Sequence, residues 1–113
     1  MIQTINTNSN KIDTLGKINF NRRELNPILR IYGQMVSCGE WRDYSISSFH
    51  SRAVFSIFRR TSETPLYNIV KKPKNFKKHG RYLVITMDGQ IISNGNTLER
   101  VLRVFERRFL KII

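Results

Sequence analysis

The residues that could carry out chemistry are few in this chain and stand far apart. Metal binding needs Cys, His or carboxylate ligands that converge on one point. Cys38, His50 and His79 fall in three different segments without a paired spacing. Catalysis by a thiolate would need a histidine placed to activate it, which the sequence does not show. We therefore expect no metal site, no cofactor and no catalytic residue.

Asp43 is the one acid in a strongly basic stretch, next to Trp41 and Arg42. As a general base it lacks a second acid or a histidine at a motif spacing. We expect its carboxylate to pair with Arg59 or Arg60 of a neighbouring strand, because structural ion pairs also perturb acids. Trp41 is expected to anchor the core or the sheet edge. The glycines stand singly and form no phosphate-binding loop, so the sequence predicts a protein that is not an enzyme.

Two clusters of basic residues indicate a binding function rather than catalysis. The first surrounds Phe76 in one loop and consists of Lys71, Lys72, Lys74, Lys77, Lys78, His79 and Arg81. A positive loop with an exposed aromatic ring can clamp phosphates while it stacks a base. The alternative is a solvated, lysine-rich hairpin tip that keeps the sheet edge from aggregating.

The second cluster follows the last helical pattern at spacings of three and four, which places it on one helix face. It consists of Arg100, Arg103, Arg107 and Lys111. A solvated outer face is the alternative, but such a face usually mixes charges of both signs. Here only Glu99 and Glu106 interrupt it, off to one side. Two positive surfaces in one small domain favour a nucleic-acid partner.

The first helix is predicted from Asn21, with Glu24 at the capping-box position, to Gly39, a typical stop. Its apolar residues recur at helical spacing. They are Leu25, Ile28, Leu29, Tyr32 and Val36, with Met35 at the edge of the stripe. Pro27 leaves a second possibility open, in which Asn26 caps the helix and Pro27 takes its first position.

The last helix is predicted from a cap at Asn96, answered by Glu99, to about Leu110. Its apolar stripe consists of Leu98, Val101, Leu102, Phe105, Phe109 and Ile112. Between the two helices, residues 44–47, 53–58, 66–71, 81–87 and 90–93 have the alternation or the apolar runs of strands. Short linkers and the hairpin signal Asp88-Gly89 make consecutive strands antiparallel neighbours.

These elements predict an α+β two-layer sandwich: a helix, a four- or five-stranded antiparallel meander and a C-terminal helix. Both helices should cover one face of the sheet. The expected core contains Leu29, Tyr32, Phe55, Ile57, Val84, Leu102 and Phe105. Residues 1–18 are polar and read as a flexible tail, and residues 19–113 as a single domain.

The chain of 113 residues has 20 Lys+Arg against 8 Asp+Glu, a formal net charge of +12. Such self-repulsion indicates an anionic partner. A single cysteine fits a reducing compartment, no segment has the roughly 20 apolar residues of a membrane span, and the start lacks the pattern of a secretory signal. We expect a cytoplasmic protein.

The runs WRDYSI, AVFSIFRR and ETPLY, with the closing pattern GxxLxxVLRVFERR, resemble a family of short, uncharacterised alphaproteobacterial proteins. The family is classed as a domain of unknown function, and the resemblance covers about residues 20–113. It implies a bacterial, cytoplasmic setting. It implies no activity, cofactor or binding residue.

We therefore expect a small basic domain that binds RNA or DNA with low sequence specificity through the basic loop and the last helix. The alternative is an adaptor for an acidic protein partner, which would dock on the sheet edge or the first helix. Attachment to an anionic membrane surface is disfavoured, because the apolar stripe of the last helix is needed for the core.

Overall fold

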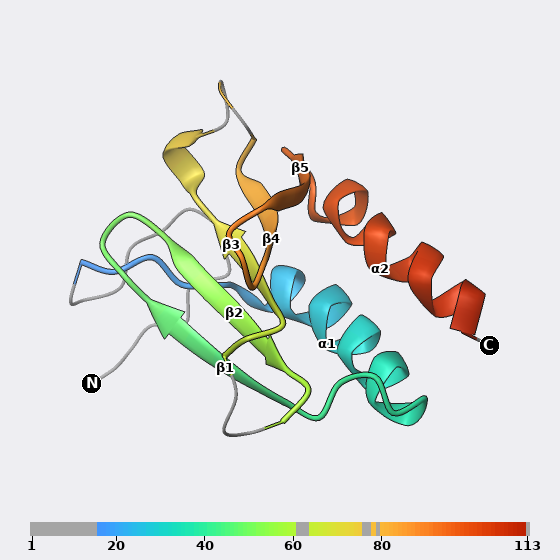
Figure 1. Cartoon of the computed structure of the whole chain (residues 1–113). Coiled ribbons are helices and arrows are strands. Elements are labelled where there is room, and N and C mark those ends of the chain that lie inside the picture. The colour runs from blue at the N-terminus through green and yellow to red at the C-terminus, as the bar shows by residue number, and fades with distance from the viewer. Residues whose placement is uncertain (1–15, 61–63, 76–77, 79, 113) are drawn as a thin grey trace.

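The computed structural model describes residues 16–60, 64–75, 78 and 80–112, and places two helices on one face of a five-stranded sheet (Figure 1). Helix α1 (Arg22–Ser37) precedes the sheet and helix α2 (Leu98–Ile112) follows it. The strands are β1 (Asp43–Ser48), β2 (Ala53–Phe58), β3 (Tyr67–Lys71), β4 (Tyr82–Thr86) and β5 (Ile91–Gly95). The predicted α+β two-layer sandwich is confirmed.

The strands follow one another across the sheet in the order β1-β2-β3-β4-β5, and every neighbouring pair is antiparallel. Strands β1 and β2 pair in register from Asp43 opposite Phe58 to Ser48 opposite Ala53. Strands β4 and β5 pair less regularly, with a register shift between Val84 and Ile85. The predicted hairpin at Asp88-Gly89 is present, because the N–H of Gly89 bonds to the Thr86 carbonyl at 2.9 Å.

The core lies between the helix layer and the inward face of the sheet. Each of its buried strand residues points toward the helices because side chains alternate along a strand. Five of the seven predicted core residues are buried: Phe55, Ile57, Val84, Leu102 and Phe105. Trp41 is also buried and meets the Phe105 ring edge-on, with 4.9 Å between centroids. The expectation that Trp41 anchors the core is confirmed.

The face of helix α1 that packs on the sheet differs from the predicted one. Its buried face consists of Glu24, Ile28, Ile31 and Met35. Leu29 and Val36 are exposed, so the prediction of a buried Leu29 is wrong, and Met35 lies at the centre of the buried face rather than at its edge. Tyr32 is half-buried on the flank, where it contacts the rings of Tyr44 and Phe55.

The helix starts are set by different contacts. Asn21 caps α1 in the predicted capping box, and Pro27 lies inside the helix without ending it. Helix α2 begins at Leu98, and the Asn96 side chain accepts a hydrogen bond from the Arg81 N–H at 3.0 Å. Thr97 rather than the predicted Asn96 directly precedes α2, and the Asn96 amide oxygen binds the backbone N–H just before β4.

A buried polar cluster joins the start of α1 to the middle of the sheet. Glu24 Oε1 accepts hydrogen bonds from the Asn21 N–H at 2.8 Å and from Lys71 Nζ at 2.9 Å. Its second oxygen, Oε2, accepts one from the Tyr82 hydroxyl. Lys71 and Glu24 are only 1% and 4% exposed. The carboxylate is therefore bound by three donors from three segments.

The same cluster holds the residues that precede α1. Lys71 Nζ also donates to the Asn19 carbonyl at 2.7 Å. The next residue toward the N-terminus, Ile18, is buried and donates its N–H to the Phe49 carbonyl at 2.8 Å. Ile18 therefore belongs to the folded domain, although the sequence analysis assigned it to the tail. Residues 1–15 of the predicted tail lie outside the described residues.

Burial shifts the pKa values of Lys71 and Tyr82 in opposite directions. Desolvation lowers the pKa of Lys71, although the hydrogen bond to Glu24 opposes that shift. Desolvation, with the hydrogen bond to Glu24 second, raises the pKa of Tyr82 above its ordinary value of 10.0. Tyr82 therefore stays protonated as a donor well into the alkaline range.

Removing one partner of the buried pair should be costly. Glu24→Gln leaves the Lys71 ammonium in the core without a counter-charge, and we expect a loss of about 3–5 kcal/mol in the free energy of unfolding. The matched surface pair is Arg108 with Glu40, at 3.0 Å and partly exposed. Glu40→Gln should cost no more than about 1 kcal/mol. Urea unfolding of both variants measures the contrast, and equal losses would contradict it.

Stability should also depend on pH through Tyr82. Above pH 10 the unfolded chain loses the Tyr82 proton while the folded chain keeps it, so folded-state stability falls as pH rises, by up to about 1.4 kcal/mol per pH unit. Tyr82→Phe removes this term. The destabilisation that the substitution causes at pH 7 should therefore shrink between pH 10 and 11 in urea unfolding. A destabilisation that stays constant over that range would refute the assignment.

Candidate nucleic-acid interface

The loop between β3 and β4 is built by backbone bonds around Asn75. A 3-10 turn, Pro73–Asn75, follows β3. The Asn75 carbonyl accepts hydrogen bonds from the N–H groups of Lys78 and Gly80, both at 3.1 Å. Lys74 and Lys78 are exposed, whereas Lys72 is half-buried. The described part of the loop therefore presents at least two lysines to solvent from a turn that the backbone itself defines.

The base of this loop lies against the start of α2. Gly80 has a φ of +93°, and a Cβ added there would lie 2.5 Å from the backbone of Gly95. Only glycine satisfies both the backbone conformation and the close approach. The bond from the Arg81 N–H to Asn96 Oδ1 ties the same two segments. These two contacts hold the end of the loop, at Gly80 and Arg81, against the residues that lead into α2.

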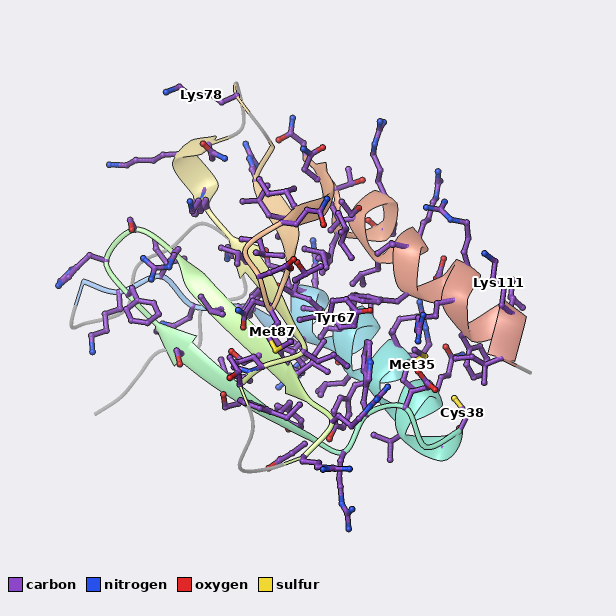
Figure 2. All side chains as sticks on the ribbon, viewed as in Figure 1. Met35, Cys38, Tyr67, Lys78, Met87 and Lys111 are labelled. Atoms are coloured by element: carbon purple, nitrogen blue, oxygen red, sulfur yellow. The ribbon has the colours of Figure 1, made fainter. Side chains whose placement is uncertain are left out.

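The outer face of α2 continues from this junction. Arg100 packs its side chain on Gly95, with its Cδ 3.1 Å from the position of an added Cβ there. Arg103, Arg107 and Lys111 follow on the same face and are all exposed, as predicted. Figure 2 shows Lys78 at the loop tip and Lys111 near the other end of α2. With a rise of about 1.5 Å per residue, residues 100–111 form a row of about 16 Å.

Lys71 does not belong to this surface. The sequence analysis placed it in the basic loop, but it is the last residue of β3, almost fully buried and bound to Glu24. Its side chain points inward because it lies two residues after the buried Ile69 on the same strand face. Phe76, Lys77 and His79, which were predicted for the loop, lie outside the described residues. Arg81 is half-buried at the base of the loop.

The expected partner of Asp43 is also wrong. Its carboxylate accepts a hydrogen bond from the adjacent Tyr44 N–H at 2.8 Å. Among the residues that the structure describes, the salt bridges are Lys71 with Glu24 and Arg108 with Glu40. The buried ion pair of this domain is thus formed by Glu24, which the sequence analysis had used only as a capping residue.

Helix α1 adds basic residues that the sequence analysis did not include. Arg22, Arg23 and Arg30 are exposed on α1, away from its buried face. The signal was present in the sequence, because residues 23 and 30 are seven apart and fall on one side of a helix. Since α1 and α2 pack side by side in one layer, their outer faces make that side of the domain strongly positive.

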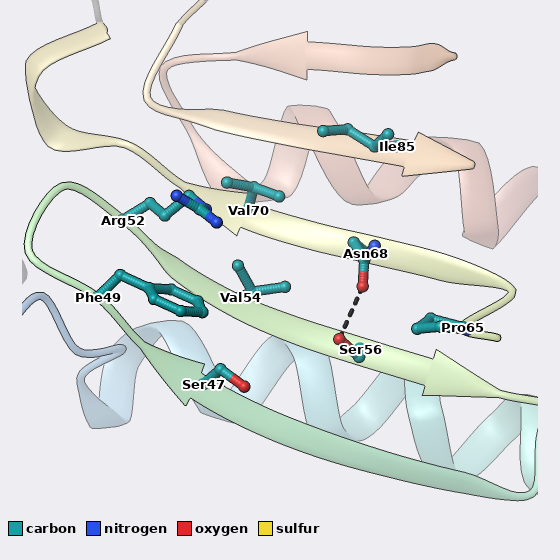
Figure 3. Close-up of a pocket in the computed structure, with 9 residues that line it drawn as sticks. All are labelled: Ser47, Phe49, Arg52, Val54, Ser56, Pro65, Asn68, Val70 and Ile85. Carbon is teal, nitrogen blue, oxygen red and sulfur yellow. Dashed lines mark hydrogen bonds between the residues drawn. The ribbon is translucent and has the colours of Figure 1, made fainter. Parts of the chain in front are cut away.

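Neither of the two described helices covers the opposite face of the sheet, which is hollowed by a shallow groove of about 320 Å³ (Figure 3). Phe49 and Arg52 lie at one end, with the guanidinium 4.4 Å from the ring centroid. Ser56 Oγ donates to Asn68 Oδ1 at 2.7 Å in its middle. The rest of its lining consists of Ser47, Val54, Pro65, Val70 and Ile85. Among the described residues that line the groove, Arg52 is the one cation, so the groove is much less suited to a polyanion than the helix layer.

Neither a metal cluster nor a membrane span is found in the part of the chain described. Those residues contain no group of three or more His, Cys, Asp or Glu side chains placed to hold a metal ion. The helices there, α1 and α2, are too short and too polar to cross a bilayer.

Comparison with known proteins assigns the chain to a family without assigning it a function. No curated protein and no solved structure matches the chain. The family profile that does match covers residues 18–102, which includes Ile18 and all five strands and ends inside α2. The resemblance stated from the sequence is confirmed: the chain belongs to the family described as proteins of unknown function, DUF2794.

Proposed function

We propose that this domain binds RNA or DNA with low sequence specificity, through a continuous positive surface formed by the β3–β4 loop and the outer face of α2. The observation that supports the proposal is the Gly80–Gly95 junction, which brings the end of the loop close to the residues that lead from β5 into α2. Its charged members in the described residues are Lys72, Lys74, Lys78, Arg81, Arg100, Arg103, Arg107 and Lys111.

The chemistry of this surface favours phosphate over base recognition. Its members are mainly flexible, exposed cations, and such side chains bind the backbone of a nucleic acid without reading its sequence. The two acids of α2, Glu99 and Glu106, are both exposed and lie to one side of the basic row by helical geometry. A row of about 16 Å matches several successive phosphates. We propose a binding role in the cytoplasm rather than catalysis.

The salt dependence of binding tests the proposal. If Lys74, Lys78, Arg100, Arg103 and Arg107 each contact a phosphate, log affinity for duplex should fall against log salt with a slope of about −4 to −5. Arg103→Gln with Arg107→Gln should make the slope shallower by about 1.8 and weaken binding to all sequences alike. Fluorescence anisotropy of labelled RNA and DNA at several salt concentrations measures both.

The matched control removes two arginines at the other end of the sheet. Arg59 and Arg60 are exposed and follow β2, whereas the loop follows β3, which runs antiparallel to β2. Arg59→Gln with Arg60→Gln changes the net charge equally and should leave the slope nearly unchanged. If both double variants act alike, total charge rather than this surface governs binding. If the unmodified protein binds nothing at low salt, an acidic protein becomes the better partner.

A substitution without charge tests the junction itself. Gly80→Ala would place a methyl group against the Gly95 backbone and would strain a positive φ. We expect weaker binding, because the loop and α2 no longer hold their relative positions. Gly89→Ala is the control: its φ is also positive, at +87°, but an added Cβ there has no neighbour within 4 Å. Anisotropy should show a loss for Gly80→Ala alone, and equal losses would contradict the role of the junction.

A further inference from the structure

Within the part of the chain that the structure describes, the side formed by β1 and α1 leaves apolar surface without a partner. Tyr32 contacts Tyr44 of β1, so the flank of α1 that carries Tyr32 faces this edge. Leu29 and Val36 lie three and four residues from Tyr32, on the same flank, and both are exposed. On β1 itself, Tyr44 and Ile46 are exposed as well, Ile46 by 45%. These apolar side chains form a strip along one side wall of the molecule. The exposed Arg22, seven residues before Leu29 on the same side of α1, lies at one end of the strip.

Strand β1 is also the less protected of the two sheet edges. Natural edge strands are usually guarded by Lys, Pro or a bulge. Strand β5 has such irregularity, since its pairing with β4 shifts register between Val84 and Ile85. Strand β1 pairs in unbroken register over all six residues and contains neither Lys, Arg nor Pro. Its one charged residue is Asp43, in a chain of net charge +12.

Backbone N–H and C=O groups on the outer side of β1 are oriented so that a further strand can pair with them. The Phe49 N–H bonds to the Arg52 carbonyl in the β1–β2 hairpin. Because bonding direction alternates along an antiparallel strand, the N–H and C=O groups of Tyr44 and Ile46 point away from β2. At Phe49 the edge is already engaged, since its carbonyl accepts the Ile18 N–H. Among the described residues, no backbone group of another segment bonds to this side of Tyr44 and Ile46. The Tyr44 N–H donates to the Asp43 carboxylate of its own strand at 2.8 Å, a bond that a pairing strand replaces.

We propose that this wall is a homodimer interface, in which β1 pairs antiparallel with β1 of a second copy about a two-fold axis at Ser45. Tyr44 then stands opposite Ile46 of the second copy, an aromatic and β-branched pair that stabilises sheets. An axis perpendicular to the sheet keeps both helix layers on the same side, which brings the two α1 flanks together. An edge strand beside an apolar helix flank is self-complementary under this symmetry.

The size of the wall and its charge both favour a second copy. Helix α1 has 16 residues and is therefore about 24 Å long, and a sheet with a helix layer is about 20 Å high. The wall then buries roughly 500 Å² per copy, or about 1,000 Å² in total, the low end for specific complexes. The strip carries Arg22 at one end of α1 and Asp43 on β1 and is otherwise apolar or uncharged. Two copies of a strongly positive molecule therefore meet there with less repulsion than across the basic row of α2. A reversible dimer follows.

Sedimentation velocity from about 1 µM to 1 mM tests the proposal, and we expect a dimer with a dissociation constant of about micromolar order. Because both copies are positive, added salt should strengthen the dimer, whereas it weakens nucleic-acid binding. The two proposals can therefore fail independently. A protein that stays monomeric over this range would overturn the dimer.

Two variants locate the interface. Ile46→Lys places a charge at the centre of the paired strands and should abolish the dimer. Ile91→Lys is the matched control on the other edge strand, β5, since Ile91 is 43% exposed, and it should dimerise like the unmodified protein. Circular dichroism melting checks that both fold. If folded Ile46→Lys still dimerises, or if Ile91→Lys is the one that becomes monomeric, the interface lies elsewhere.

A cross-link tests the register. With Ser45 on the two-fold axis, the two Ser45 residues form a non-hydrogen-bonded pair with Cα atoms about 4.5 Å apart, which a disulfide can span. Ser45→Cys in a Cys38→Ser background should form a covalent dimer under mild oxidation. Asn94→Cys on β5, in the same background, should not. Cross-linking of both variants alike, or of neither, would refute the proposed pairing.

Discussion

The buried carboxylate of Glu24 is the constraint on which the rest of the structure depends. A lone ion in the core would cost several kcal/mol, but here the carboxylate accepts bonds from the Asn21 N–H, Lys71 Nζ and the Tyr82 hydroxyl. Those donors belong to the start of α1, to β3 and to β4. One charge thus fixes the rotation of α1 over the sheet, and with it which flank of α1 remains outside the core.

The exposed flank is a consequence of that rotation. With Glu24 turned inward, Ile28, Ile31 and Met35 follow it into the core. Leu29 and Val36 are left on the side of β1, beside Tyr44 and Ile46. The apolar face of α1 is therefore wider than the part of it that is buried in the core. This exposed flank, together with the edge of β1 beside it, is the surface that the proposed dimer would cover.

The sequence predicted the features that depend on local hydrophobic periodicity. It missed those that depend on contacts with residues far away in the chain. Helix α2 and its basic row were correct because an uninterrupted apolar stripe defines both faces. The face of α1 was wrong because hydrophobic periodicity cannot count Glu24 as a core residue until Lys71 is known to meet it. Because side chains alternate along a strand, the position of Lys71 two residues after Ile69 could have shown that both side chains point inward. No local sequence pattern predicts the contact between Gly80 and Gly95, or that Asp43 forms an ion pair with neither Arg59 nor Arg60. Both features depend on how segments far apart in the sequence approach each other.

The charge distribution also shows why the two proposed surfaces are compatible. The positive row lies on α2 and the loop, and the apolar strip lies at β1, on the far side of α1 from α2. A two-fold axis at β1 leaves both positive rows free, and because the helix layers stay on one side of the sheet, both rows remain accessible to one polyanion. A nucleic acid long enough to reach both would bind the second row at a high effective concentration. Each surface then strengthens the other: the shared polyanion offsets the repulsion between the two copies, and the dimer gives a weak phosphate contact a second point of attachment.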